Sequence, residues 1–147
     1  ALADDGAPLV LQVLQALASG QAVAKAQASE GISEAPMLAV SDAKVDWNTS
    51  AVVIDRLIRG VTPAPGAWTT LAGVRLRLGP VELVDAPQLE PGEVLASKRQ
   101  VLVGTADGVV ALGQVAPAGK KWMDAAAWAR GARLAEHTVL GQEVEAN

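Results

Sequence analysis

The chain has 147 residues, and its hydrophobic fraction of 50% is sufficient for one domain with a core and an appended segment. It contains no Cys, which excludes disulfides, cysteine nucleophiles and thiolate zinc sites, and no Phe or Tyr, so Val, Leu, Ile, Ala and four Trp must form the core. The net charge is −4, but residues 44–134 hold 11 basic and eight acidic residues and both ends are acidic, an asymmetry typical of a nucleic-acid surface.

Residues 1–20 are predicted to form a helix. Asp4 and Asp5 suit its N-terminus, Pro8 its first turn, and Gly20 the position just after its end. Because a short helix is marginal alone in water, this one needs a surface to pack on. Its apolar stripe consists of Leu9, Val10, Val13, Leu14 and Leu17.

Residues 21–46 lack sustained periodicity and contain Gly31, Pro36 and several Ser, which predicts a linker that lies over a surface. After Pro36 the segment continues with Met37 and Val40, and Lys44 is the basic residue of this part.

A second helix is predicted within residues 47–67, which read W-N-T-S-A-V-V-I-D-R-L-I-R-G-V-T-P-A-P-G-A. Asn48 or Thr49 is expected to cap it by accepting a bond from an orphan N–H group. Gly60 is expected just after its last turn, and Pro63 forbids continuation. Its apolar stripe is Ala51, Ile54, Leu57, Ile58 and Val61.

About five short strands are predicted next, because Val- and Leu-rich segments alternate with turn residues. They are Ala67–Leu71, Val74–Val84, Gly92–Ala96, Val101–Thr105 and Val109–Val115. Asp107-Gly108 is a strong hairpin signal. Short antiparallel strands in series favour a small closed or partly open barrel, since closure removes exposed edges. Asp124 is then expected to cap a short helix over residues 125–130 that Gly131 ends.

The run at residues 47–67 closely resembles the start of the C-terminal domain of methionyl-tRNA formyltransferases, W-x-x-x-A-x-x-[IV]-x-R-x-[IV]-R-[AG]-x-x-P-x-P-G-A. The matching residues are Trp47, Ala51, Ile54, Arg56, Ile58, Arg59, Gly60, Pro63, Pro65, Gly66 and Ala67. A second motif, P-A-G-K-K-W-M-D-A-A-A-W-A-R-G at residues 117–131, follows in the right order. The resemblance covers most of residues 35–134.

This resemblance implies a mainly β fold with flanking helices: a small OB-like Greek-key barrel, preceded by a helix and an extended linker. Residues 1–20 would be the last helix of a missing N-terminal catalytic, Rossmann-like domain, and residues 21–46 a linker. Residues 47–134 would form the OB-like, tRNA-binding C-terminal domain, and residues 135–147 a tail.

Basic side chains are the candidates for phosphate contact, because each neutralised phosphate releases counterions. Arg75 and Arg77 alternate with apolar residues, so both are predicted to point to one face of a strand. Trp122 follows Lys121 and is a candidate for base stacking, whereas the other three Trp are expected in the core. The full candidate RNA-binding set is Arg75, Arg77, Lys98, Arg99, Lys120, Lys121, Trp122 and Arg130.

Some basic residues leave alternatives open. Lys98 and Arg99 could simply form the polar tip of a hairpin. Arg56, on the predicted second helix and outside this set, is a weaker candidate, because its spacing from Asp55 and the apolar stripe also suits an intradomain salt bridge or contact with the end of that helix.

No catalytic constellation, phosphate-binding glycine loop or metal-ligand spacing is present in the sequence. His137 lies near Glu136 in the polar tail and is expected to be an exposed histidine. Glu90 and Glu93 flank Pro91 and are expected to be solvated. The resemblance accounts for this, because the family's catalytic residues and folate pocket lie in its N-terminal domain. No catalytic residue and no metal ligand is therefore assigned.

By the resemblance, the intact enzyme transfers a formyl group from 10-formyltetrahydrofolate to the methionine amino group of initiator methionyl-tRNA. The fragment would hold no cofactor, would be inactive alone, and would contact the tRNA backbone and the N-terminal catalytic domain. We expect a cytoplasmic monomer and no membrane association, since no apolar run approaches the ~18 residues of a membrane span.

Two alternatives remain open. The first is the barrel domain of another folate-dependent formyltransferase or hydrolase, for instance one acting on an amino sugar, which needs no basic face. The low net charge favours it, and so do Met37 and Val40, which stand near places where members of the resembled family commonly carry lysines. The second is a non-enzymatic OB-like interaction module. A start at Ala1 without Met, in the middle of an element, favours a fragment over this module.

Overall fold

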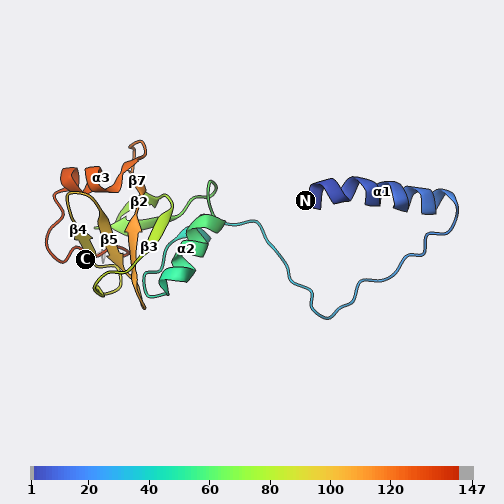
Figure 1. The fold of residues 1–147 in the computed structure, drawn as a ribbon, viewed down its shortest axis with the longest axis horizontal. Coiled ribbons are helices and arrows are strands. Elements are labelled where there is room, and N and C mark those ends of the chain that lie inside the picture. Colours follow the sequence, from blue (N-terminus) through green and yellow to red (C-terminus); the bar gives the residue numbers. More distant parts are fainter. Residues whose placement is uncertain (1, 143–147) are drawn as a thin grey trace. The chain divides into compact units, whose positions relative to one another are not determined.

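The computed structural model describes residues 2–142, and the chain divides into two compact units, residues 1–36 and 37–147. Figure 1 shows the first unit as one helix followed by a segment without regular secondary structure, and the second unit as β-sheets with flanking helices. No helix of the described part combines the length and apolar character needed to cross a membrane. The expected residue 1 of the first helix and residues 143–147 of the expected tail lie outside the described residues.

Helix α1 (Leu2–Ala18) confirms the predicted first helix. Gly20 ends it as predicted: its φ is +71°, its N–H bonds the Leu17 carbonyl at 3.1 Å, and the N–H of Gln21 bonds that of Ala16 at 2.8 Å. The prediction for Pro8 was wrong, because α1 begins at Leu2 and the proline therefore lies inside the helix. The predicted apolar stripe is 50–59% exposed along its whole length.

The second unit contains two four-stranded antiparallel sheets. Sheet A has the order β1-β2-β7-β8, and sheet B has the order β3-β6-β5-β4. The elements are a short 3-10 helix η1 (Ser41–Ala43), α2 (Ala51–Gly60), β1 (Trp68–Leu71), β2 (Val74–Leu78), β3 (Val81–Val84), β4 (Val94–Ala96), β5 (Val101–Gly104), β6 (Val109–Leu112), β7 (Gln114–Pro117), β8 (Met123–Asp124) and α3 (Ala125–Ala132). The mainly β class with flanking helices is confirmed, and the strands lie in two sheets rather than in one closed ring.

Two of the predicted strands are each divided in two, because the chain passes from one sheet to the other in their middle. The first break lies at Gly79 between β2 and β3, and the second at Gly113 between β6 and β7. The two corners touch. A Cβ on Gly79 would lie 3.0 Å from the carbonyl oxygen of Gln114, and one on Gly113 would lie 2.9 Å from that of Pro80. A side chain at Gly113 would therefore force a shift of the backbone, and one at Gly79 would press tightly on it, so glycine favours the close approach at both corners.

The N-terminus of α2 is capped twice. The Ser50 hydroxyl accepts from the N–H of Val53 at 3.3 Å, so the predictions of Asn48 and Thr49 as caps were wrong. A carboxylate from the β5–β6 turn, Asp107 Oδ1, accepts from the N–H of Ala51 at 2.9 Å. This second cap ties the helix to sheet B, and an acidic group also suits the positive end of the helix dipole.

Both predicted terminal glycines instead lie inside their helices. Gly60 is the last residue of α2, which Val61 follows as the C-cap. Gly131 lies within α3, and Arg133 ends that helix in the left-handed conformation with φ +50°. The N-cap of α3 was predicted correctly, since Asp124 Oδ1 accepts from the N–H of Ala127 at 3.0 Å.

The core lies between the sheets and under the two helices of this unit. Figure 1 shows α2 beside β3 and α3 near β7. Its strands contribute mainly valines, and full burial of each such side chain contributes about 1.5–3 kcal/mol. Among the core residues that are completely or nearly completely buried are Ile54, Ile58, Val101, Val103, Val110 and Val115. Trp47 and Trp128 are buried as predicted, and Trp68 packs partly against the core.

Residues 138–142, which lie in the segment expected to be a tail, pair with both sheets. Leu140 bridges to Leu71 at the end of β1, and Val139 bridges to Glu93 beside β4. The N–H of Gly141 bonds the Thr70 carbonyl at 2.8 Å. Because these contacts cross from sheet A to sheet B, the segment holds the two sheets together.

Candidate nucleic-acid interface

One face of sheet A carries the arginines that the alternation of β2 predicted. Arg75 and Arg77 are exposed. The leucines that alternate with them along β2, Leu76 and Leu78, are each only 2% exposed. In the antiparallel register of the β1–β2 hairpin, Arg77 lies opposite Trp68. Side chains of directly opposite residues share a face, so this tryptophan belongs to the same surface.

Each arginine of this face stacks on an indole ring. The Arg75 Cζ atom lies 4.0 Å from the centroid of Trp68, and the Arg77 Cζ atom lies 4.8 Å from that of Trp122. The Lys44 Nζ atom lies 5.6 Å from the Trp68 centroid. Such contacts contribute about 0.5–1 kcal/mol each at exposed sites. A guanidinium that stacks on an aromatic face keeps the N–H groups at its edges able to donate hydrogen bonds.

Trp122 reaches Arg77 across the sheet. Arg77 lies opposite Ala116 of β7, and Val115 lies opposite Met123 of β8. Continuing this register by one residue places Trp122 beside Ala116. The alanine is small and 2% exposed, which lets the guanidinium and the indole meet above it.

Lys120 and Lys121 lie in the turn that joins β7 to β8. The N–H of Lys120 bonds the Pro117 carbonyl at 2.9 Å, and Gly119 adopts φ +72°. Both lysines are exposed, and Trp122 directly after them is 42% exposed. The turn thereby adds two ammonium groups beside the Arg77–Trp122 pair.

The basic face of sheet A, defined as Arg75, Arg77, Lys120, Lys121 and the two indoles, contrasts in charge with sheet B. Residues 68–78 and 114–124, which form sheet A and its hairpin turns, hold four basic residues and one acidic residue, the helix-capping Asp124. Residues 81–112, which form sheet B and its turns, hold five acidic and two basic residues. The fold therefore concentrates positive charge on one sheet of an acidic chain, which is the distribution a phosphate-binding surface needs.

The remaining candidates form a second basic group. Lys98 and Arg99 are in the β4–β5 turn, where the Ser97 hydroxyl accepts from the N–H of Arg99 at 3.3 Å. The Arg130 Nη1 atom of α3 donates to the Lys98 carbonyl at 3.1 Å and so fixes this turn.

Arg59 on α2 lies outside both basic groups. Its Nε atom pairs with Asp55 Oδ2 of the same helix at 3.0 Å.

Lys44 and Trp68 were not among the candidate residues. Trp68 could have been found, because a two-residue turn at Ala72-Gly73 sets the register that places it opposite Arg77. Lys44 had no such signal, since it reaches Trp68 from outside the hairpin through a bridge between the two residues.

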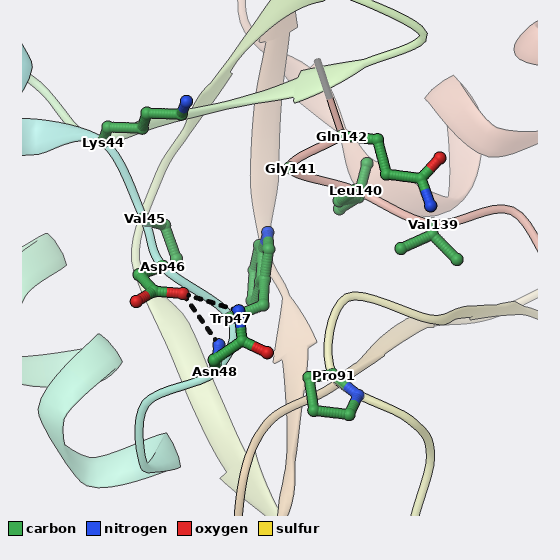
Figure 2. Close-up of a pocket in the computed structure, with 10 residues that line it drawn as sticks. All are labelled: Lys44, Val45, Asp46, Trp47, Asn48, Pro91, Val139, Leu140, Gly141 and Gln142. Carbon is green, nitrogen blue, oxygen red and sulfur yellow. Dashed lines mark hydrogen bonds between the residues drawn. The ribbon is translucent and has the colours of Figure 1, made fainter. Parts of the chain in front are cut away.

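A hollow of about 440 Å³ lies on another part of this unit, between residues 44–48 and residues 139–142. Figure 2 shows the Trp47 indole among the residues that line this hollow, with Asp46 and Asn48 beside it in the chain. The backbone N–H and the side-chain amide of Asn48 both donate to Asp46 Oδ1, each at 3.0 Å. These bonds, the backbone one first, lower the pKa of the Asp46 carboxyl below its ordinary 3.8. The Trp47 Nε1 atom donates to Thr69 at 3.0 Å. These polar groups therefore already serve the fold.

His137 contacts a glutamate of the sheet B side. Its Nδ1 atom lies 3.1 Å from Glu93 Oε1, and the histidine side chain is 85% exposed, as the sequence predicted. The N–H of Glu90 donates to Glu93 Oε2 at 3.1 Å. This bond, followed by the contact with His137, lowers the pKa of Glu93 below its ordinary 4.5. Within residues 2–142, no three His, Asp or Glu side chains come together as a metal site would require.

The lowered pKa of Glu93 predicts a pH-dependent stability. A carboxyl with a depressed folded-state pKa stabilises the fold above its ordinary pKa and loses this effect as the pH falls through the folded-state value. We expect Glu93→Gln to unfold at lower urea concentration than the wild type at pH 7, with the difference vanishing in acid below pH 4.5. Urea unfolding across pH tests this, with Glu82→Gln on β3 as the exposed control. A difference that is constant with pH would contradict the prediction.

Comparison with known proteins shows which proteins this chain is similar to. A family model described as the formyl transferase C-terminal domain matches residues 37–133. The methionyl-tRNA formyltransferase of Thermobifida fusca (strain YX) is 50% identical over 143 residues, covering 97% of this chain and 46% of that protein. That of Nocardioides sp. (strain ATCC BAA-499 / JS614) is 51% identical over 143 residues, covering 95% and 45%. The chain spans about half the length of these curated relatives.

Solved structures show the same fold. A variant of HypX from Aquifex aeolicus superposes with a TM-score of 0.58 at 22% identity, covering 86% of this chain and 23% of that one. HypX in complex with tetrahydrofolic acid gives a TM-score of 0.56 at 22% identity, covering 82% and 22%.

Proposed function

The chain belongs to the formyl transferase C-terminal domain family, and from this premise we propose that it is the tRNA-holding part of a methionyl-tRNA formyltransferase. The intact enzyme would formylate the methionine amino group of initiator methionyl-tRNA in the cytoplasm, using 10-formyltetrahydrofolate. The observation that carries the proposal is the basic face of sheet A, where two arginines lie over indole rings and two lysines lie in the adjoining turn.

Such a face suits a phosphate backbone rather than a base sequence. Guanidinium and ammonium groups neutralise phosphates irrespective of the bases, and the charge of the acceptor determines the affinity. Holding the guanidiniums on indoles lowers the entropy that they lose on binding. We therefore propose that the domain orients tRNA by shape and charge, as a single copy.

We assign the formyl transfer itself to an N-terminal catalytic domain of the intact enzyme. We assign the folate cofactor and the catalytic groups to no residue of this chain. The amino-sugar and interaction-module alternatives lack a comparable supporting observation, because the relatives of about 50% identity carry the methionyl-tRNA name.

A salt titration of tRNA binding tests the proposal. We expect the chain to bind initiator tRNA and an unrelated elongator tRNA with equal affinity, and log K to fall with log salt at a slope of about −3 if four phosphates are contacted. Fluorescence anisotropy with end-labelled tRNA measures both. Absence of binding to either tRNA at low salt, or a slope near zero, would contradict the role.

A further inference from the structure

A hollow of about 260 Å³ opens beside the basic face of sheet A, next to the Arg77–Trp122 pair. Its walls come from the Pro-rich turn after α2, the β2–β3 corner, the start of β7 and the residue before β8. They include Thr62, Pro63, Arg77, Gly79, Gln114 and Trp122. Three other segments of the chain thus meet the Trp122 indole.

The lining combines flat apolar surface with a few polar groups. Pro63 and the ring of Trp122 provide the apolar surface. Gly79 lies beside this ring, since even a Cβ there would be in ordinary van der Waals contact with the Trp122 Cζ3 atom, at 3.6 Å. The Arg77 guanidinium lies 4.8 Å from the indole centroid and presents a second π surface. Gln114, which is exposed, also lines the hollow, and its side chain carries an amide donor and acceptor.

Trp122 differs from the other tryptophans in its exposure. Trp47 and Trp128 are 3% and 6% exposed and belong to the core, and Trp68 also packs partly against it. Trp122 is 42% exposed, although an exposed indole contributes little to folding. Lys120 and Lys121 directly precede it, so positive charge flanks the hollow on the side of the turn.

We infer that this hollow receives one unpaired nucleobase of the bound RNA, stacked against the Arg77–Trp122 pair while Lys120 and Lys121 hold the adjoining phosphates. The inference rests on the proposed function and extends it, because the phosphate contacts alone would not require an aromatic hollow. Bases stack on indole and guanidinium planes irrespective of their identity. The domain would therefore prefer RNA with unstacked nucleotides over RNA that presents only its backbone.

A pair of short RNAs with equal charge tests this inference. The probes are a single-stranded octauridylate and the same backbone with abasic units in place of the central nucleotides, both end-labelled for anisotropy. We expect the wild-type chain to bind the base-bearing probe about tenfold more tightly. In Trp122→Leu this ratio should fall to about one, and in Trp122→Phe, which keeps an aromatic ring, it should largely remain.

The outcomes separate the inference from the proposed function. Equal wild-type affinity for the two probes, together with a steep salt dependence, would overturn the base pocket and leave the phosphate-holding role intact. Loss of affinity in Trp122→Leu by the same factor for both probes would also overturn it. Failure of the wild type to bind either probe at low salt would refute the base pocket, whereas the tRNA titration decides separately whether the phosphate-holding role fails. The wild-type comparison involves no mutation, so it stands even if a variant folds poorly.

Discussion

Gly104→Ala is expected to lower the free energy of unfolding of the second unit by roughly 3 kcal/mol or more, or to prevent its folding. A Cβ at this position would lie 2.2 Å from the carbonyl oxygen of Glu90 and 2.7 Å from that of Leu89. Both obstacles are backbone atoms, so no side-chain rotation can relieve the overlap.

The backbone around Gly104 is held on both sides. Its N–H bonds the Glu93 carbonyl at 3.0 Å, and its own carbonyl accepts from the N–H of Gly92 at 2.9 Å. Gly104 also pairs with Val109 in the β5–β6 ladder. To make room for a methyl group, the segment around residues 89–93 would have to leave β5 and lose these bonds.

Urea unfolding followed by tryptophan fluorescence measures this effect. Gly131→Ala is the matched control, because Gly131 lies inside α3 and a Cβ there meets no atom within 4 Å. Alanine is the better helix former, so the control should gain about 0.5–1 kcal/mol. A Gly104→Ala protein whose stability lies within about 1 kcal/mol of the wild type would show that the predicted overlap is relieved by other means.

Removing the charges of the basic face should have the largest effect on RNA binding. The variant carries Arg75→Gln, Arg77→Gln, Lys120→Gln and Lys121→Gln. We expect its affinity for tRNA at low salt to fall about 100-fold, and the slope of log K against log salt to decrease in magnitude by about 3, since up to four phosphate contacts are lost. The remaining binding should depend little on salt.

A control variant removes the same number of charges elsewhere. It carries Lys25→Gln, Arg56→Gln, Arg59→Gln and Arg133→Gln, none of which belongs to the basic face. Its net charge equals that of the first variant, so similar losses in the two would mean that overall charge, rather than the face, controls binding. A third variant with Lys98→Gln, Arg99→Gln and Arg130→Gln shows whether the second basic group contributes. Urea unfolding of all three checks that the loss of the cation–π contacts has not unfolded the protein.

Local signals allowed several elements to be predicted from the sequence. The apolar stripe and following prolines of α2, the Asp-Gly turn and the Asp124 cap each depend on residues within a few positions of one another. For the same reason, period-two alternation correctly placed Arg75 and Arg77 on one face. What this sequence determined by itself is therefore its family, its mainly β class and the side of β2 that carries charge.

Only the tertiary structure decided how those parts meet. The sheet-switching corners at Gly79 and Gly113, the Asp107 cap on α2 and the pairing of residues 138–142 all depend on contacts between distant segments. The candidate site shows the same division, because Arg77 meets Trp122 across β7, 45 residues along the chain. Periodicity in the sequence indicates which face of a strand or helix a residue lies on. The neighbours that it meets on that face depend on the strand order, which the chain adopts to bury its core.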